Sequence, residues 1–186
     1  MALSATIYAF DIELADSDRN VYESLQLRVA RHPSETAEYL LARLLAYCLE
    51  YAEGIAFSKG LSDPDEPAIL VRDLTGALRS WIEVGSPDAA RLHRASKAAP
   101  RVAVYAHRNA AQLAERYRGE RIHRAERLEL YALDSQWLGS LAPGLSRRMG
   151  LSLTVADRHL YLTAGGETTS SAVERLAIVP SQQALR

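Results

Sequence analysis

A strand, a helix and a second strand follow one another between Arg79 and His107, and this order constrains the fold more than any other feature. Apolar residues dominate Arg79–Val84 and again Val102–Ala106. Between them, Ser86-Pro87-Asp88 predicts a helix start, with Ser86 as the cap and proline at the first helical position. Two strands joined by a helix pair in parallel, with the helix packed on their sheet. We therefore expect a mixed α/β (α+β) fold, a central sheet flanked by helices.

Additional β-hairpins are predicted towards both ends of the chain. Apolar and polar residues alternate over Thr6–Leu14, and after a polar run the alternation resumes over Val21–Val29. This pattern is typical of two half-buried antiparallel strands. A closing hairpin is predicted from Leu151–Val155 and Leu160–Thr163, which flank the turn Asp157-Arg158. Both hairpins would be additions to the central sheet.

The remaining elements are predicted from periodicity and turn signals. Ser34 can cap a helix whose first turn holds Glu35 and whose apolar face extends to Ala52. Ala68–Val71 would form a strand that is joined to Arg79–Val84 through the turn at Thr75-Gly76. Further elements are expected in the second half of the chain, namely helices near 109–117 and 136–141 and a strand near 128–133.

Length and charge restrict the classes of protein to which the chain can belong. Its 186 residues suit one domain, predicted over 1–180 with a tail at 181–186. The formal net charge of -1 gives no global attraction to nucleic acid or to an anionic membrane. Cys48, the single cysteine, excludes an intrachain disulfide and is expected in the core. With no apolar run of membrane-spanning length and no signal-peptide pattern, we expect a cytoplasmic protein without a membrane partner.

Two acidic side chains are predicted to converge where the antiparallel strands begin and end. Asp65 lies just before the first strand, and Glu83 lies near the end of the second. Carboxylates at close range repel unless a cation neutralises them, and Mg²⁺ binds one or two carboxylates together with water. Each residue also has a structural interpretation, because Asp65 lies in a turn-forming segment and Glu83 could form a salt bridge with Lys59 or Arg94.

Five blocks of this sequence resemble the signature blocks of the YaeQ family, and together they span essentially the whole chain. The resemblance implies a variant of the PD-(D/E)XK nuclease-like fold. It also implies that Asp65 and Glu83 bind the metal and that Glu35 is an additional acid of the site. The matching blocks are Ala2–Tyr8, Ala30–Thr36, Phe57–Leu61, Asp65–Pro67 and Trp81–Asp88.

One position departs from the pattern of this superfamily. The lysine that normally follows the second acid by two residues is replaced by Gly85. We hypothesise that a basic residue of the next helix takes over, and Arg94 and Lys97 share one face of that helix. An arginine would stabilise charge but could not act as a base.

The leading functional prediction is a phosphodiesterase that hydrolyses nucleic acid with Mg²⁺ or Mn²⁺. In this prediction Glu35, Asp65, Glu83, Arg94 and Lys97 form the catalytic site. The alternative is a catalytically inactive nuclease-like fold that serves as a nucleic-acid or protein interaction module. An arginine-rich run over 116–127 could contact phosphates, although the interspersed glutamates favour a solvated connection.

Overall fold

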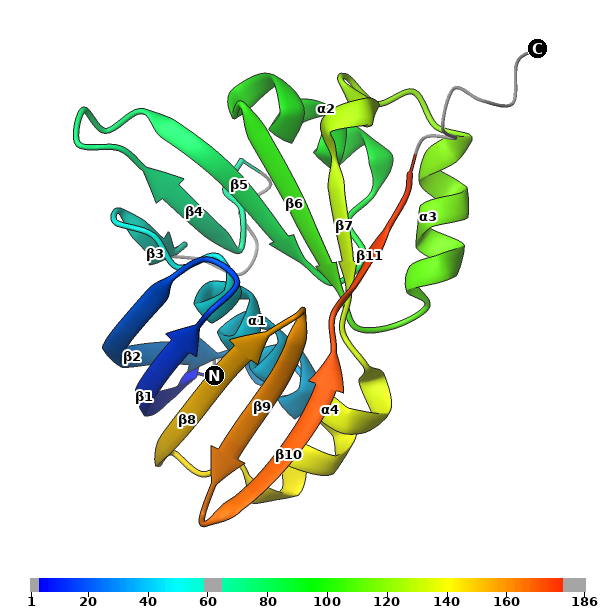
Figure 1. Ribbon diagram of the computed structural model, residues 1–186. Coiled ribbons are helices and arrows are strands. Elements are labelled where there is room, and N and C mark those ends of the chain that lie inside the picture. The colour runs from blue at the N-terminus through cyan, green and yellow to red at the C-terminus, as the bar shows by residue number, and fades with distance from the viewer. Residues whose placement is uncertain (1–3, 59–64, 179–186) are drawn as a thin grey trace. The chain divides into compact units, whose positions relative to one another are not determined.

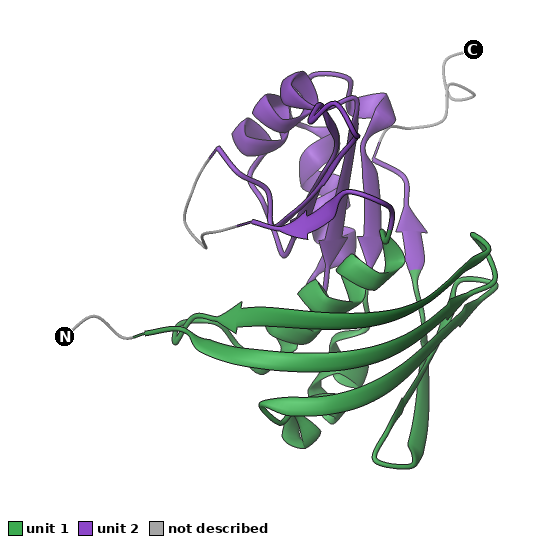
Figure 2. Ribbon diagram, turned by 90° about the vertical axis from the view of Figure 1, so that its left-hand side faces the viewer, with its two compact units in different colours: residues 1–51, 133–173 green, residues 52–132, 174–186 purple. Residues whose placement is uncertain are grey.

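The computed structural model describes residues 4–58 and 65–178 and divides into two compact units, each with its own sheet (Figures 1 and 2). Unit 1 comprises residues 1–51 and 133–173, and unit 2 comprises residues 52–132 and 174–186. One domain over 1–180 stays a prediction, and the predicted tail lies outside the described residues. The mixed α/β class is confirmed, but with two sheets in place of one.

Unit 1 contains a mixed sheet of five strands in the order β10-β9-β8-β1-β2. Both predicted hairpins are present, and β1 pairs in parallel with β8, so that the hairpins share this sheet. They are therefore not additions to the central sheet, as the sequence suggested. The strands are β1 (Thr6–Asp16), β2 (Val21–Arg31), β8 (Arg148–Ala156), β9 (His159–Ala164) and β10 (Glu167–Ala172).

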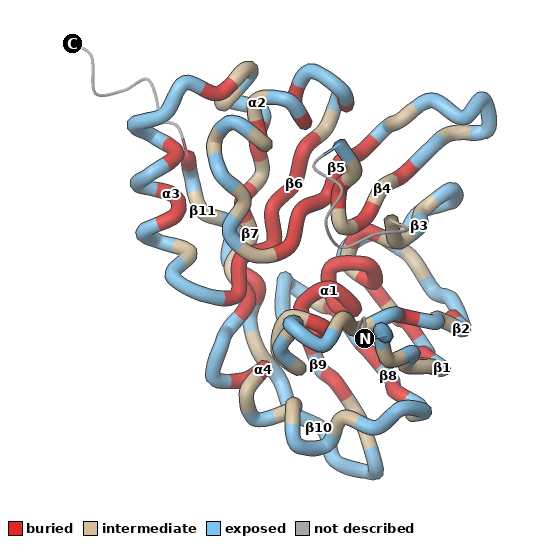
Figure 3. Tube along the Cα trace, turned by 180° about the vertical axis from the view of Figure 1, so that it is seen from behind, coloured by how far each residue is buried: buried red, intermediate tan, exposed pale blue. Residues whose placement is uncertain are grey.

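The inner face of this sheet is apolar and covered by helices. Phe10, Ile12 and Leu153 are buried there, because every second side chain of a strand points to the same face. Helices α1 (Ala37–Leu49) and α4 (Ser135–Leu141) lie behind the strands in Figure 1 and in front of them in Figure 3, which is seen from the opposite side. The 3-10 turn η2 (Ala142–Gly144) follows α4.

Unit 2 contains a mixed sheet of six strands in the order β11-β7-β6-β5-β4-β3. The predicted strand–helix–strand unit is confirmed, because β5 pairs in parallel with β6, and β4 pairs antiparallel with β5 as expected. The strands are β3 (Ile55–Phe57), β4 (Ile69–Arg72), β5 (Leu78–Val84), β6 (Arg101–Ala106), β7 (Glu129–Ala132) and β11 (Glu174–Leu176).

Helices α2 (Ala89–Ala98) and α3 (Ala110–Arg118) pack on one face of this second sheet. Their apolar residues form a single buried cluster with side chains of β5, β6 and β7. The short turn η1 (Ala125–Arg127) precedes β7. The cluster includes Trp81, Leu92, Val104, Leu113, Tyr117 and Leu130.

Two predicted helix caps are wrong by two residues. Thr36, and not Ser34, caps α1, since its Oγ1 accepts a hydrogen bond from the Tyr39 amide at 3.1 Å. Glu35 consequently lies just before α1 instead of in its first turn. Asp88, and not Ser86, caps α2. Strands β10 and β11 were not predicted. No helix in the described part of the chain has the length and apolarity needed to span a membrane.

Candidate functional site

Glu83 is a buried carboxylate on strand β5, with only 5% of its surface exposed. Its Oε1 accepts two hydrogen bonds of 2.6 Å, one from Trp81 Nε1 and one from Arg91 Nε. Trp81 lies two residues earlier on the same strand and therefore on the same face. Arg91 comes from the first turn of α2, where its backbone amide donates to the cap Asp88 at 2.7 Å. The cap thus fixes the helix turn that carries the guanidinium.

The charge of Glu83 is balanced inside the fold. Burial raises the pKa of its carboxyl group, and the hydrogen bonds from Trp81 and Arg91 together with the Arg91 charge oppose that rise. The Arg91 guanidinium also lies 5.9 Å from the centre of the Trp81 ring, within the range of a cation–π contact. Glu83, Arg91 and Trp81 therefore form one connected polar group at the edge of the core.

The structure brings the backbone beside Asp65 to this group. Arg91 Nη2 donates a hydrogen bond to the carbonyl oxygen of Glu66 at 2.5 Å. This bond links the backbone just before strand β4 to helix α2. Asp65 itself is exposed, whereas Glu83 is buried. Pro64, the proline of the predicted Pro64-Asp65 element, lies outside the described residues. The two predicted metal ligands thus belong to one unit and have different exposure.

Glu35 belongs to unit 1 and has partners there. Its Oε2 accepts from the His32 amide at 3.0 Å, and its Oε1 lies 3.6 Å from Arg43 Nη1. The Arg43 side chain also donates to the backbone oxygen of Ala30. Glu35 therefore ties the end of β2 to α1, and its role as a third catalytic acid stays a prediction.

Arg91 is the basic residue of α2 that contacts Glu83, while Arg94 and Lys97 are exposed on the same helix. The roles proposed for Arg94 and Lys97 stay predictions. The sequence signal for Arg91 was its position three residues after an Asp that can cap a helix. Gly85 has φ +101°, a backbone conformation that favours glycine, which explains why no lysine stands at this end of β5.

The side chains around Glu83, as arranged, do not fit a divalent cation. A metal ion there would compete with the Arg91 guanidinium for Oε1. Within residues 4–58 and 65–178, no three His, Cys, Asp or Glu side chains form a group that could hold a metal ion. The Mg²⁺ or Mn²⁺ site at Asp65 and Glu83 therefore stays a prediction, one that requires Arg91 to move or to share the carboxylate.

A second candidate site is the outer face of the five-stranded sheet in unit 1. Its side chains alternate with those of the buried inner face, and both helices of unit 1 pack on the inner side. The registers align Ala15 with Tyr22 and Thr154, and Thr154 with Tyr161. Tyr22 is 61% exposed and Tyr161 is 42% exposed. The face thus presents two aromatic rings in one row across the strands.

Three arginines line an open hollow at the other end of this face. Arg28 and Arg148 flank Ala9 on the neighbouring strands β2 and β8, and Arg147 adjoins them. Asp11 is the only acidic residue among the described residues that line the hollow, so its formal charge is positive. None of the three arginines has a hydrogen bond or ion pair from its side chain to another described residue. Sequence reasoning missed this group, because Arg28 is brought to Arg147 and Arg148 by the pairing of β2 and β8 with β1.

Comparison with known proteins shows similarity over nearly the whole chain. A family model described as YaeQ protein matches residues 1–173. The uncharacterized protein YaeQ of Salmonella typhi is 37% identical over 164 residues, which cover 88% of this chain and 91% of that protein. The uncharacterized protein YaeQ of Escherichia coli (strain K12) is 36% identical over 165 residues, with 88% and 91% covered.

Solved structures share the same architecture. The crystal structure of YaeQ protein from Pseudomonas syringae superimposes with a TM-score of 0.84 and 33% identity, covering 92% of this chain and 96% of that chain. The YaeQ protein from Xanthomonas axonopodis pv. citri gives a TM-score of 0.83 and 29% identity, covering 92% and 98%. The arrangement of strands and helices described above is therefore similar to crystal structures of such proteins.

Proposed function

The chain belongs to the YaeQ family, and from this starting point we propose that it is a binding module for single-stranded nucleic acid. The binding surface is the outer face of the five-stranded sheet in unit 1. The observation that carries the proposal is the hollow in which Arg28, Arg147 and Arg148 gather without a side-chain partner among the described residues. Guanidinium groups in this state are ready to contact phosphates.

The chemistry of the face suits a single strand. Phosphates would lie against the arginines, and unpaired bases would stack on Tyr22 and Tyr161, since exposed aromatic side chains accept bases of any sequence. The aromatic row lies six residues along the strand from Ala9, a distance of about 20 Å, so one strand of several nucleotides reaches both. Glu13, also on this face, already accepts a hydrogen bond from Ser24 at 2.6 Å.

This proposal takes up the alternative to hydrolysis. The leading prediction requires a divalent cation at Asp65 and Glu83, and the Arg91 guanidinium holds the Glu83 carboxylate instead. A binding role needs no metal, and the local arginine group offers the attraction that the net charge of -1 does not. Binding without cleavage is thus the function that this geometry supports best.

The proposal is tested by fluorescence anisotropy with labelled single-stranded RNA, single-stranded DNA and duplex DNA, between about 50 and 200 mM salt. We expect the wild type to prefer single strands, with affinity falling steeply as salt rises. The test variant carries Arg28→Gln, Arg147→Gln and Arg148→Gln together. Its plot of log affinity against log salt should be less steep than that of the wild type by about 2, since each lost phosphate contact reduces the steepness by roughly 0.7.

A matched triple variant in unit 2 is the control for the loss of positive charge. Arg121→Gln, Arg124→Gln and Arg127→Gln remove three charges from the arginine-rich connection and should leave the salt slope close to that of the wild type. An equal loss in both variants would contradict binding on the sheet. Incubation with Mg²⁺ or Mn²⁺ separates the alternatives, because cleavage that disappears in Glu83→Ala and Asp65→Ala would establish the nuclease instead.

A further inference from the structure

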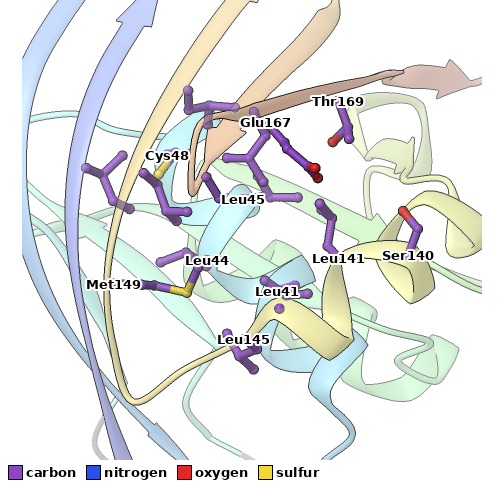
Figure 4. A pocket seen from close by; sticks show the side chains of 16 residues that line it. Leu41, Leu44, Leu45, Cys48, Ser140, Leu141, Leu145, Met149, Glu167 and Thr169 are labelled. Atoms are coloured by element: carbon purple, nitrogen blue, oxygen red, sulfur yellow. The ribbon is translucent and has the colours of Figure 1, made fainter.

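A cavity of about 170 Å³ lies inside unit 1, between the inner face of the sheet and helices α1 and α4 (Figure 4). Its walls are apolar, and leucines come from both layers, such as Leu44 of α1, Leu141 of α4 and Leu153 of β8. The mouth opens where lining residues are exposed, among them Ser140, Glu167 and Thr169. The cavity is comparable in size to apolar cavities of about 150 Å³ that hold benzene.

Polar atoms gather on one side of the cavity. Figure 4 shows the oxygens of Ser140, Glu167 and Thr169 there, away from Leu145 and Met149. The Ser140 hydroxyl donates to the Trp137 carbonyl at 2.6 Å, and Thr169 Oγ1 accepts from Trp137 Nε1 at 2.9 Å. The Glu167 carboxylate has no hydrogen bond or ion pair within the described residues. Two of these groups thus have partners in the fold, and the carboxylate remains for a ligand.

Glu167 is the only charged residue that lines the cavity in the described part of the chain. Cys48, the other ionisable residue in the lining, stays protonated because burial raises the pKa of its thiol to about 12. A ligand at this mouth therefore meets an apolar interior and a single negative charge. This combination favours an apolar body with a cationic head and opposes a fatty acid, whose carboxylate would be repelled.

We propose that this cavity binds a small aliphatic amine, with about six carbons inside the apolar chamber and the protonated amine at Glu167. The hydroxyls of Ser140 and Thr169 flank that head group and can accept further hydrogen bonds from it. The site is separate from the outer face of the sheet, so the proposal does not rest on nucleic-acid binding.

The probes are butylamine, hexylamine, hexanol and hexanoate, titrated into the full chain by calorimetry. Hexylamine should bind more tightly than hexanol, and hexanoate should bind least. Each added methylene between butylamine and hexylamine should tighten binding about fourfold, the gain expected from burying one methylene group. In wild-type protein labelled at leucine methyl groups, hexylamine should shift the NMR signals of Leu44, Leu141 and Leu145.

Two variants test the head group and the chamber separately. Glu167→Gln should weaken hexylamine binding up to about fivefold and leave hexanol unchanged, whereas the control Glu23→Gln, an exposed acid on β2, should change neither. Ala164→Leu fills part of the cavity and should abolish binding of both while the far-UV circular dichroism spectrum stays that of the wild type. Equal affinity for the amine, the alcohol and the carboxylate would overturn the proposal. So would unperturbed leucine signals in the wild type.

Discussion

Glu83 illustrates how a single carboxylate can be stabilised within a nearly apolar strand. Both hydrogen bonds to Oε1 come from side chains fixed by their own elements, Trp81 on β5 and Arg91 on α2. Removing one partner from such a pair leaves the other charge in a poorly solvated position. Because the Arg91 side chain is 22% exposed, water can compensate part of that loss on its side.

We expect Glu83→Ala and Arg91→Ala each to lower the free energy of unfolding by about 2 kcal/mol, less than for fully buried pairs. The double variant should lose less than the sum of the two, by at least about 1 kcal/mol, since both single changes break the same contact. Urea unfolding followed by circular dichroism measures all three values.

Arg94→Ala is the matched control for this cycle. Arg94 is exposed on the same helix, and its truncation should change stability by no more than about 0.5 kcal/mol. If Glu83→Ala retained wild-type stability while it abolished binding of Mn²⁺, the ion pair would be dispensable and the metal-site prediction would gain support. The structural interpretation of Glu83 would then be wrong.

The sequence showed that Glu83 needs a partner but not which one. Of the two predicted partners, Lys59 lies outside the described residues and Arg94 is exposed, and the contact that the structure shows is Arg91. Its choice depends on where α2 begins, and the sequence placed that start two residues too early, at Ser86 instead of Asp88. Arg91 and Arg94 are three residues apart and share one face of α2, but Arg91 lies in the first turn, where it contacts Glu83.

Helix ends and polar strands are the elements that the sequence predicted least well. Strand β10 has the sequence Glu-Thr-Thr-Ser-Ser-Ala, in which no apolar alternation marks a strand. It forms because β9 offers an edge with free backbone groups, and pairing across the Gly165-Gly166 turn satisfies them. Strands with alternating residues, such as β1, were predicted because each has one buried face.

The cap of α1 gives a test at this scale. Thr36→Ala should lower the free energy of unfolding by about 1 kcal/mol, because it removes the acceptor of the Tyr39 amide at the helix start. Ser34→Ala, two residues earlier, should cost less than about 0.5 kcal/mol, since this exposed serine bonds only to His32 within the described residues. Thermal or urea unfolding compares the two, and the reverse order would place the cap at Ser34.

At the scale of the whole molecule, the order of strands determines which surfaces exist. The parallel pairing of β1 with β8 joins segments more than a hundred residues apart and places Arg148 opposite Ala9, with Arg28 on its other side. The sequence analysis predicted two separate hairpins, so it did not bring Arg28 together with Arg147 and Arg148. Glu35, Asp65 and Glu83, by contrast, were named from three short sequence blocks that match the family, and their catalytic role stays a prediction.

The measurement that tests the central proposal most directly is ultraviolet cross-linking of a bound single-stranded oligonucleotide, followed by mass spectrometry of the peptides. The proposal predicts cross-links to the peptides that contain Tyr22 and Tyr161, the two exposed rings on the outer face of the sheet in unit 1. Cross-links confined to unit 2, in the peptides around Asp65 and Glu83, would contradict it and place the nucleic acid at the predicted nuclease site.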